Sequence, residues 1–177
     1  MPGGRIDPDR HFTPLGIAVL TISDSRERST DTSGDLLAER VASAGHELRA
    51  RALVAGDKPA IQHQARLWID DPAVDVIVST GGTGLTGADL APEAFRELFD
   101  RELEGFTVLW HLISYETVGV STMQSRACAG IAGSTVIYSL PGSNGACRDG
   151  WDRLISRQLD SRHRPCSIVE VMTHRPR

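Results

Sequence analysis

The chain has 177 residues, of which 40% are hydrophobic and 24% are charged, and its formal net charge is −4. These values are typical of one soluble globular domain that is long enough to bury a core without disulfides. A weakly acidic chain has no broad positive field for DNA or RNA, and no apolar run reaches the length of a membrane span, so we expect neither nucleic acid nor a membrane as a partner.

The cysteines and the N-terminal residues indicate a reducing compartment. Cys128, Cys147 and Cys166 are odd in number and lack C-x-x-C spacing, which argues against both a disulfide framework and a structural zinc site. Residues 1–14 are polar and rich in proline, glycine and charge, unlike a signal peptide. We therefore expect free thiols in a cytoplasmic protein.

Residues 1–13 have the composition of a disordered tail, and we place one domain over residues 14–174. The domain begins with residues 15–22, a continuous apolar run that predicts a strand covered on both faces of a parallel sheet. Ser23 follows this strand. Because open α/β sheets bind ligands at the carboxyl ends of their strands, Ser23 is a candidate binding residue, although serine is also common in turns.

A helix, a strand and a second helix come next. Residues 30–33 can cap a helix whose apolar stripe spans residues 36–44, and residues 47–54 alternate weakly, as in a strand. Asp57 then opens a helix that stops at the Asp-Asp-Pro of residues 70–72. A role as helix N-cap explains Asp57 fully, yet its place beyond the end of a predicted strand also suits a metal ligand.

The rest of the chain is organised around a glycine-rich stretch at residues 75–93. A short β-branched strand at residues 76–78 is followed by four glycines in seven residues. Glycine permits positive φ angles, so the backbone can turn several N–H groups toward one anion. This pattern predicts an anion cradle formed by Gly81, Gly82, Thr83 and Gly84.

A carboxylate lies at the edge of this cradle. Asp89 precedes Pro92 and Glu93, which mark a helix start, so Asp89 lies near an N-cap position. Carboxylate and phosphate repel each other unless a divalent cation bridges them, so the stretch predicts phosphate together with Mg²⁺. Asp57 follows another predicted strand, and the two carboxylates are therefore candidates to converge on one metal ion.

Other interpretations of the glycines remain open. Residues 82–87 match the spelling G-x-G-x-x-G, but the helix signals come later than in a dinucleotide site, which makes NAD binding the weaker alternative. No Lys-Ser/Thr pair closes the loop, so it is not a Walker-type P-loop. A loop that only turns the chain is the simplest alternative.

The remaining residues continue to alternate between helices and strands. Residues 141–144, Pro-Gly-Ser-Asn, follow a strand and offer backbone N–H groups and a hydroxyl, which is a second anion-binding arrangement. The overall order predicts an α/β fold with a three-layer, doubly wound, mostly parallel sheet and helices on both faces. Predicted helices cover residues 92–100, 106–118, 125–130 and the region of residues 151–159, and predicted strands cover residues 134–140 and 166–171.

Several motifs in this order carry a family resemblance. They are residues 80–84 (Thr-Gly-Gly-Thr-Gly), Asp89, Pro92-Glu93, Ser125-Arg126 and residues 140–143 (Leu-Pro-Gly-Ser). Together they resemble the MoaB/MogA family of molybdenum cofactor biosynthesis proteins, which is related to the G domain of gephyrin. The likeness spans residues 15–164, and residues 31–34 and 99–102 are most similar to the MoaB branch.

The resemblance implies a substrate, a reaction and a set of site residues. The substrates are molybdopterin and ATP, the cofactor is Mg²⁺, and AMP passes from Mg-ATP to the terminal phosphate of molybdopterin with release of pyrophosphate. Asp57 and Asp89 correspond to the functional, metal-binding aspartates of the family. The substrate-binding candidates are Ser23, Gly81, Gly82, Thr83, Gly84, Glu93, Ser125, Arg126, Pro141, Gly142 and Ser143.

The sequence therefore leaves two alternative functions. The first is a molybdopterin adenylyltransferase, and the second is a non-catalytic molybdopterin-binding or assembly protein on the same scaffold, since a fold does not fix a function. The resemblance also implies a homotrimer or hexamer and other molybdenum cofactor biosynthesis proteins as partners.

Overall fold

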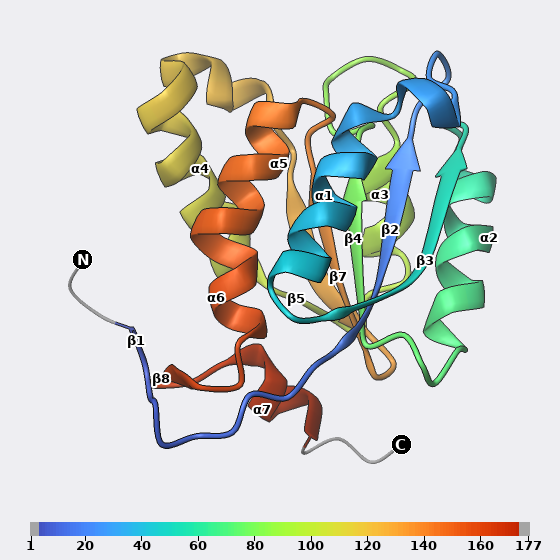
Figure 1. Cartoon of the computed structure of the whole chain (residues 1–177). Helices are drawn as coiled ribbons and strands as arrows, with labels where there is room; N and C mark the ends of the chain where they lie inside the picture. Colours follow the sequence, from blue (N-terminus) through green and yellow to red (C-terminus); the bar gives the residue numbers. More distant parts are fainter. Residues whose placement is uncertain (1–3, 174–177) are drawn as a thin grey trace.

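The computed structural model describes residues 4–173 and contains a central six-stranded sheet with the order β3-β2-β4-β7-β6-β5 (Figure 1). The first four strands in this order are parallel, whereas β6 runs antiparallel to both of its neighbours. The strands are β2 (Gly16–Ile22), β3 (Glu47–Val54), β4 (Val76–Thr80), β5 (Arg101–Glu102), β6 (Cys128–Ala132) and β7 (Thr135–Leu140).

Helices cover both faces of this sheet, as the doubly wound prediction requires (Figure 1). One face carries α1 (Thr32–Ser43), α4 (Glu104–Val118) and a helical stretch that runs from α5 (Asn144–Gly150) through the π-helical turn Trp151–Ile155 into α6 (Ser156–Leu159). The other face carries α2 (Lys58–Ile69) and α3 (Ala91–Arg96). The predicted fold class is therefore confirmed.

The continuous apolar run of β2 follows from this three-layer arrangement. Ile17 and Val19 pack into the core under α1 and α4, whereas Ala18 and Leu20 pack into the core under α2 and α3. Each fully buried side chain of this kind contributes about 1.5–3 kcal/mol to folding. A strand buried on both faces has no solvent side, so it shows no polar alternation.

The strand order creates a crevice at one end of the sheet. β2 pairs with β3 on one side and with β4 on the other, so the chain reverses its direction of winding at β2. The connections that leave β2 and β4 therefore diverge, and ligands of open α/β sheets bind outside the carboxyl ends of strands at such a switch point.

The predicted disordered tail is wrong for residues 4–13, which form an N-terminal strap along the C-terminal segment. β1 (Arg5–Ile6) pairs antiparallel with β8 (His163–Arg164), and the guanidinium of Arg10 lies 2.5 Å from the carboxylate of Glu170. These long-range partners hold a segment whose composition alone favours disorder. Residues 1–3 of the predicted tail, and residue 174 at the predicted domain end, lie outside the described part.

Two predicted elements have a different structure. The helix expected at residues 125–130 does not form. Residues 125–127 are a loop after the 3-10 helix Gly119–Gln124, and residues 128–130 begin strand β6, because the small residues of this stretch let the chain pack closely beside β7 and under Phe99. The edge strand expected at residues 166–171 is instead helix α7 (Ile168–Thr173), in which Ile168 and Val169 join the core. No helix among the described residues combines the length and apolarity needed to cross a membrane.

Candidate functional site

A cavity of about 520 Å³ lies at the carboxyl ends of β2, β4 and β7, and it brings together most of the predicted binding residues. Its wall contains the glycine-rich loop after β4, the serine-rich loop after β2 and the turn after β7. It is lined by Ile22, Ser23, Ser25, Arg26, Thr80, Gly81, Gly82, Thr83, Gly84, Asp89, Gln124, Ser125, Pro141, Gly142 and Ser143.

The glycine loop forms the floor of this cavity. Gly81 has φ 102° and Gly82 has φ 67°, and a Cβ atom at Gly81 would lie 2.1 Å from the carbonyl oxygen of Ile22. Only glycine allows this backbone and this close approach. Among the hydrogen bonds of residues 4–173, none uses the N–H of Gly82 or Thr83. Both groups are therefore available to an anion in the cavity.

Two serines shape the loops that flank this floor. The Ser23 hydroxyl oxygen accepts hydrogen bonds from the N–H groups of Ser25 and Arg26 at 3.3 and 3.1 Å. The Ser143 hydroxyl oxygen accepts from Ala146 N–H at 3.1 Å and caps α5. A hydroxyl that accepts such bonds keeps its own proton, so each serine can still donate to a ligand.

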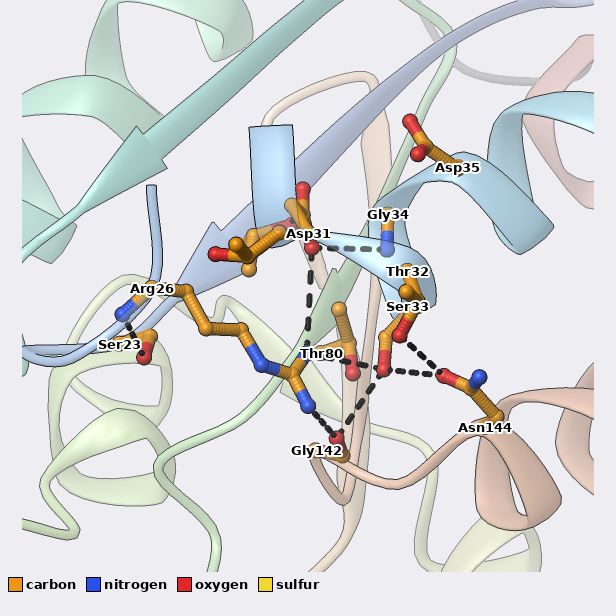
Figure 2. Close-up of polar contacts among 12 residues, drawn as sticks. Ser23, Arg26, Asp31, Thr32, Ser33, Gly34, Asp35, Thr80, Gly142 and Asn144 are labelled. Carbon is orange, nitrogen blue, oxygen red and sulfur yellow. Dashed lines mark hydrogen bonds and ion pairs between the residues drawn. The ribbon is translucent and has the colours of Figure 1, made fainter. Parts of the chain in front are cut away.

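Arg26 is the cation of the cavity wall, and sequence reasoning missed it. Figure 2 shows its guanidinium reaching across from the loop after β2, where it donates to Ser33 Oγ at 2.9 Å and to the carbonyl oxygen of Gly142 at 3.0 Å. No spacing in the sequence separates Arg26 from an ordinary surface arginine. Its role depends on the distant turn after β7.

Asp31 anchors the helix that holds Ser33 in place. Its side chain is 1% exposed, accepts from Thr21 Oγ1 at 2.7 Å and caps α1 by accepting from Gly34 N–H at 2.9 Å (Figure 2). Arg26 and Arg51 lie 3.9 and 3.3 Å from its oxygens. A buried carboxylate with this many partners is fixed in position, and it fixes the start of α1 beside the cavity.

Asp89 lies at the edge of the cavity, as predicted, but its carboxylate does not cap the following helix, whose N-cap is Leu90. It accepts hydrogen bonds from the hydroxyl and the N–H of Thr86 at 2.5 and 2.9 Å. The hydroxyl bond, followed by the N–H groups of Thr86 and Gly84 and by the charge of Arg126, lowers the pKa of Asp89 despite its partial burial. The cavity therefore has a carboxylate at its edge near neutral pH.

Arg126 and Glu93, two predicted binding residues, brace the outer side of the glycine loop and are not among the cavity-lining residues. The guanidinium of Arg126 donates to the carbonyl oxygen of Gly84 at 2.7 Å and also to the carbonyl oxygen of Asp89 and the carboxylate of Glu93. The structure thus places them where they support the loop from behind.

Asp57 also lies outside the cavity lining and caps α2, where it accepts from Ala60 N–H at 2.8 Å. Its neighbour Gly56 contacts the Asp89 loop closely, since a Cβ atom at Gly56 would lie 2.9 Å from the carbonyl oxygen of Ala88. Asp57 and Asp89 therefore belong to adjacent loops, although only Asp89 reaches the cavity.

The described residues contain no group of three or more His, Cys, Asp and Glu side chains suited to hold a metal ion. Mg²⁺ that binds together with a nucleotide needs fewer protein ligands, because one or two carboxylates, the substrate phosphates and water complete its six ligands. The donors present, Asp89 at the cavity edge and Asp57 on the next loop, fit such a substrate-borne ion better than a resident one.

Sequence comparisons relate the chain to known proteins. Residues 18–161 match the family described as "Probable molybdopterin binding domain". The chain is 47% identical over 157 residues to molybdenum cofactor biosynthesis protein B of Escherichia coli K12, with coverage of 89% of this chain and 92% of that protein. It is 42% identical over 142 residues to the protein of the same name from Bacillus cereus, covering 80% and 84% of the two chains.

Solved structures agree with these sequence matches. A crystal structure of molybdenum cofactor biosynthesis protein B superposes with a TM-score of 0.82 at 39% identity, covering 85% of this chain and 94% of that one. The tungsten cofactor synthesizing protein MoaB from Pyrococcus furiosus superposes with a TM-score of 0.73 at 31% identity, covering 91% and 96%. With the fold, the sequence and the family profile in agreement, the chain belongs to the MoaB/MogA family of molybdopterin-binding-domain proteins.

Proposed function

We propose that this protein acts in molybdenum cofactor biosynthesis by binding molybdopterin in the cavity at the carboxyl ends of β2, β4 and β7. The observation that carries the proposal is the glycine cradle, where the N–H groups of Gly82 and Thr83 have no acceptor among residues 4–173 and the close contact of Gly81 with the Ile22 carbonyl allows no side chain. The names of the curated relatives support the same assignment.

The terminal phosphate of molybdopterin is the group that this cradle suits. Backbone N–H groups bind a phosphate through hydrogen bonds but carry no net charge. The guanidinium of Arg26 on the adjacent wall supplies the positive charge. The hydroxyl protons of Ser23 and Ser143 add donors from the two flanking loops. We assign the pterin end to the remainder of the cavity, toward Ser125 and Gln124.

The reaction we propose is adenylylation of that phosphate. An oxygen of the molybdopterin phosphate forms a bond to the α-phosphorus of ATP, and the bond to the β-phosphate breaks, so AMP is transferred and pyrophosphate leaves. Such transfers depend mainly on positioning and on charge neutralisation, which Arg26 and the loop N–H groups supply from the protein. Bound Mg²⁺ would neutralise phosphate charge, with Asp89 and Asp57 as its proposed protein ligands.

A non-catalytic binding or assembly role is the second candidate, and one observation favours it. Asp57 is engaged as the cap of α2 and does not line the cavity, so only one carboxylate lies directly at the binding site. A protein with this arrangement could hold molybdopterin for a partner without transferring AMP.

One assay separates the two functions. Purified protein is mixed with molybdopterin, ATP and Mg²⁺, and adenylylated molybdopterin and pyrophosphate are quantified. Equal formation of both products supports the adenylyltransferase. Molybdopterin binding without either product supports the binding protein, and absence of molybdopterin binding overturns both proposals.

We also propose that the protein forms a homo-oligomer through the outer face of α4. Val108, Leu112 and Tyr115 are each 60% exposed and lie at helical spacing on this face, and such a set on a small domain is typical of a contact surface. A second copy is the proposed occupant, with another molybdenum cofactor biosynthesis protein as the alternative. In analytical ultracentrifugation, the double substitution Leu112→Glu and Tyr115→Glu should convert the oligomer to monomers that remain folded.

A further inference from the structure

A second cavity, of about 320 Å³, lies between α4, the α5–α6 helical stretch and β8. It shares no lining residue with the proposed molybdopterin site. Its lining residues come from α4 and the residue before it, from β7, from the α5–α6 helical stretch and from β8, elements that Figure 1 labels. Its walls are mainly apolar, formed by Leu103, Phe106, Leu109 and Leu154.

The inner wall of this cavity carries a tyrosine whose hydroxyl has no hydrogen-bond partner in the described part of the chain. Tyr138, on β7, is 2% exposed, and its ring packs edge-on against Phe106 with the ring centroids 5.2 Å apart. Its hydroxyl makes no hydrogen bond within residues 4–173, and burial raises the pKa of Tyr138, so the phenol stays protonated. A hydroxyl in a cavity wall that has no partner in the protein is open to a hydrogen-bonding atom of a ligand.

The rim of the cavity carries an arginine without an acidic partner among residues 4–173. The neighbouring Arg153 is paired with Glu116 at 2.6 Å, whereas Arg157 is exposed and forms no ion pair among the described residues. Leu109, which is 50% exposed, lies on the same lining, so the cavity opens to solvent there. A ligand in this cavity would contact the apolar walls with its body and the Tyr138 hydroxyl with its inner end. A charged group at its outer end would lie beside Arg157.

We propose that this cavity binds a small amphipathic organic acid, with an apolar, ring-sized body between α4 and α6, a hydrogen-bonding atom at the Tyr138 hydroxyl and an anionic group at Arg157. The volume is at the lower end of the roughly 300–1,000 Å³ of ligand cavities, which limits the ligand to a small molecule. An apolar lining with a few convergent polar groups is the usual composition of such sites. This site is independent of molybdopterin binding.

The test uses the full chain and the fluorescent aromatic sulfonate 8-anilinonaphthalene-1-sulfonate as the probe. Wild-type protein should bind one probe molecule with a saturable rise in fluorescence. Gly105→Phe should weaken binding more than about 10-fold, because Gly105 lines the cavity and a side chain there has open space around its Cβ, so a phenyl ring can occupy the cavity or its entrance without a clash at the Cβ. An unchanged melting temperature verifies that Gly105→Phe folds.

Two milder variants test the two polar contacts separately. Tyr138→Phe should weaken binding about 2- to 10-fold, the usual range for one hydrogen bond, and should leave the salt dependence unchanged. Arg157→Gln should weaken binding about 2- to 5-fold and abolish most of the salt dependence, because an exposed ion pair is screened by salt. Different responses to salt distinguish contact with the probe from a general loss of structure.

Matched controls identify the other places where the probe can bind. Val108→Ser changes the proposed contact face of α4 outside the cavity, and Arg26→Gln changes the first cavity; both should bind the probe like the wild type. If Val108→Ser or Arg26→Gln removes the signal while Gly105→Phe keeps it, the proposal is wrong. Absence of saturable binding to the wild type also overturns it, including the case in which a second copy of the chain covers the cavity.

Discussion

The guanidinium of Arg26 donates a hydrogen bond of 3.0 Å to the carbonyl oxygen of Gly142, a residue 116 positions further along the chain. This bond joins the loop after β2 to the turn after β7 across the mouth of the proposed molybdopterin site. Ser33 reinforces it, since its Oγ lies 2.9 Å from Arg26 Nη1 and 3.1 Å from the same carbonyl oxygen. The cation is thus held in place before any anion arrives, which lowers the entropic cost of binding.

The first prediction concerns this cation. Arg26→Gln should weaken molybdopterin binding by about 10- to 100-fold, because a charge-assisted hydrogen bond contributes about 1.5–3 kcal/mol. Arg26→Lys keeps the charge but loses the planar, forked guanidinium. Its affinity for molybdopterin should therefore lie between those of the wild type and Arg26→Gln. Isothermal titration calorimetry measures both. Arg40→Gln is the matched control, because Arg40 pairs with Asp152 at 2.9 Å on the surface and should leave the affinity unchanged.

The second prediction tests the glycine cradle. Gly82→Val should abolish molybdopterin binding, since Gly82 has φ 67° and a Cβ there would lie 3.2 Å from Ile22 Cγ2. The strained backbone should also cost about 1–3 kcal/mol of stability. Gly87→Ala, in the same loop, is the control because its Cβ would meet no atom within 4 Å. Wild-type affinity in a folded Gly82→Val protein would remove the cradle from the site.

The third prediction compares the two aspartates. Asp57→Asn should leave stability almost unchanged, because asparagine caps a helix about as well as aspartate. If Asp57 neutralises phosphate through Mg²⁺, the same change should lower adenylylation by tens to thousands of fold, about 2–4 kcal/mol of transition-state stabilisation. Asp89→Asn should abolish turnover while the protein stays folded. Calorimetric melting and product formation are measured side by side, and wild-type turnover in Asp57→Asn would leave that residue with a capping role only.

The fourth prediction is a pH dependence of stability that depends on His46. Burial lowers the pKa of His46, with the charge of Asp160 opposing the shift, and Nδ1 accepts a hydrogen bond from Leu15 N–H at 3.2 Å. The unfolded chain, in which the pKa is about 6.5, therefore takes up the proton more readily. Stability is complete above that pH and declines as the pH falls toward the lower pKa of the folded state.

Thermal melting from pH 7.5 to 5.5 measures this decline. His46→Phe should lower stability at pH 7.5 by about 1–3 kcal/mol, because the buried Leu15 N–H loses its acceptor, and should flatten the decline. His63→Gln, a change at an exposed histidine, should keep the decline of the wild type. A His46→Phe profile as steep as the wild type would assign the pH dependence to other groups.

The parallel strands were predictable because their signal is local. Residues 47–54, for example, form β3 over the predicted range, and the apolar run at residues 15–22 lies over β2. Strand β6 was not predictable, because Ala, Cys and Gly carry little periodicity and the strand exists through pairing with β7. In α7 the β-branched residues favour a strand, but burial of Ile168 and Val169 against the core favours a helix.

The residues of the candidate site also differ in whether a local sequence signal predicts them or only contacts with distant residues reveal them. Gly81 and Gly82 were predictable because an unusual density of glycine indicates an unusual backbone. Arg126 was predicted as a binding residue, but its motif does not reveal that the guanidinium donates to the carbonyl oxygen of Gly84 within the glycine loop. Arg26 was missed because its partners, Ser33 and the carbonyl of Gly142, converge only when the sheet has formed.

The N-terminal strap has a consequence for the order in which the molecule is completed during translation. Arg5 and Ile6 leave the ribosome long before their pairing partners, Arg164 and His163. The strap therefore has no place to dock while the sheet assembles, and it remains accessible to chaperones, processing enzymes and proteases throughout synthesis. A product truncated before β8 would therefore leave the strap undocked and open to cleavage.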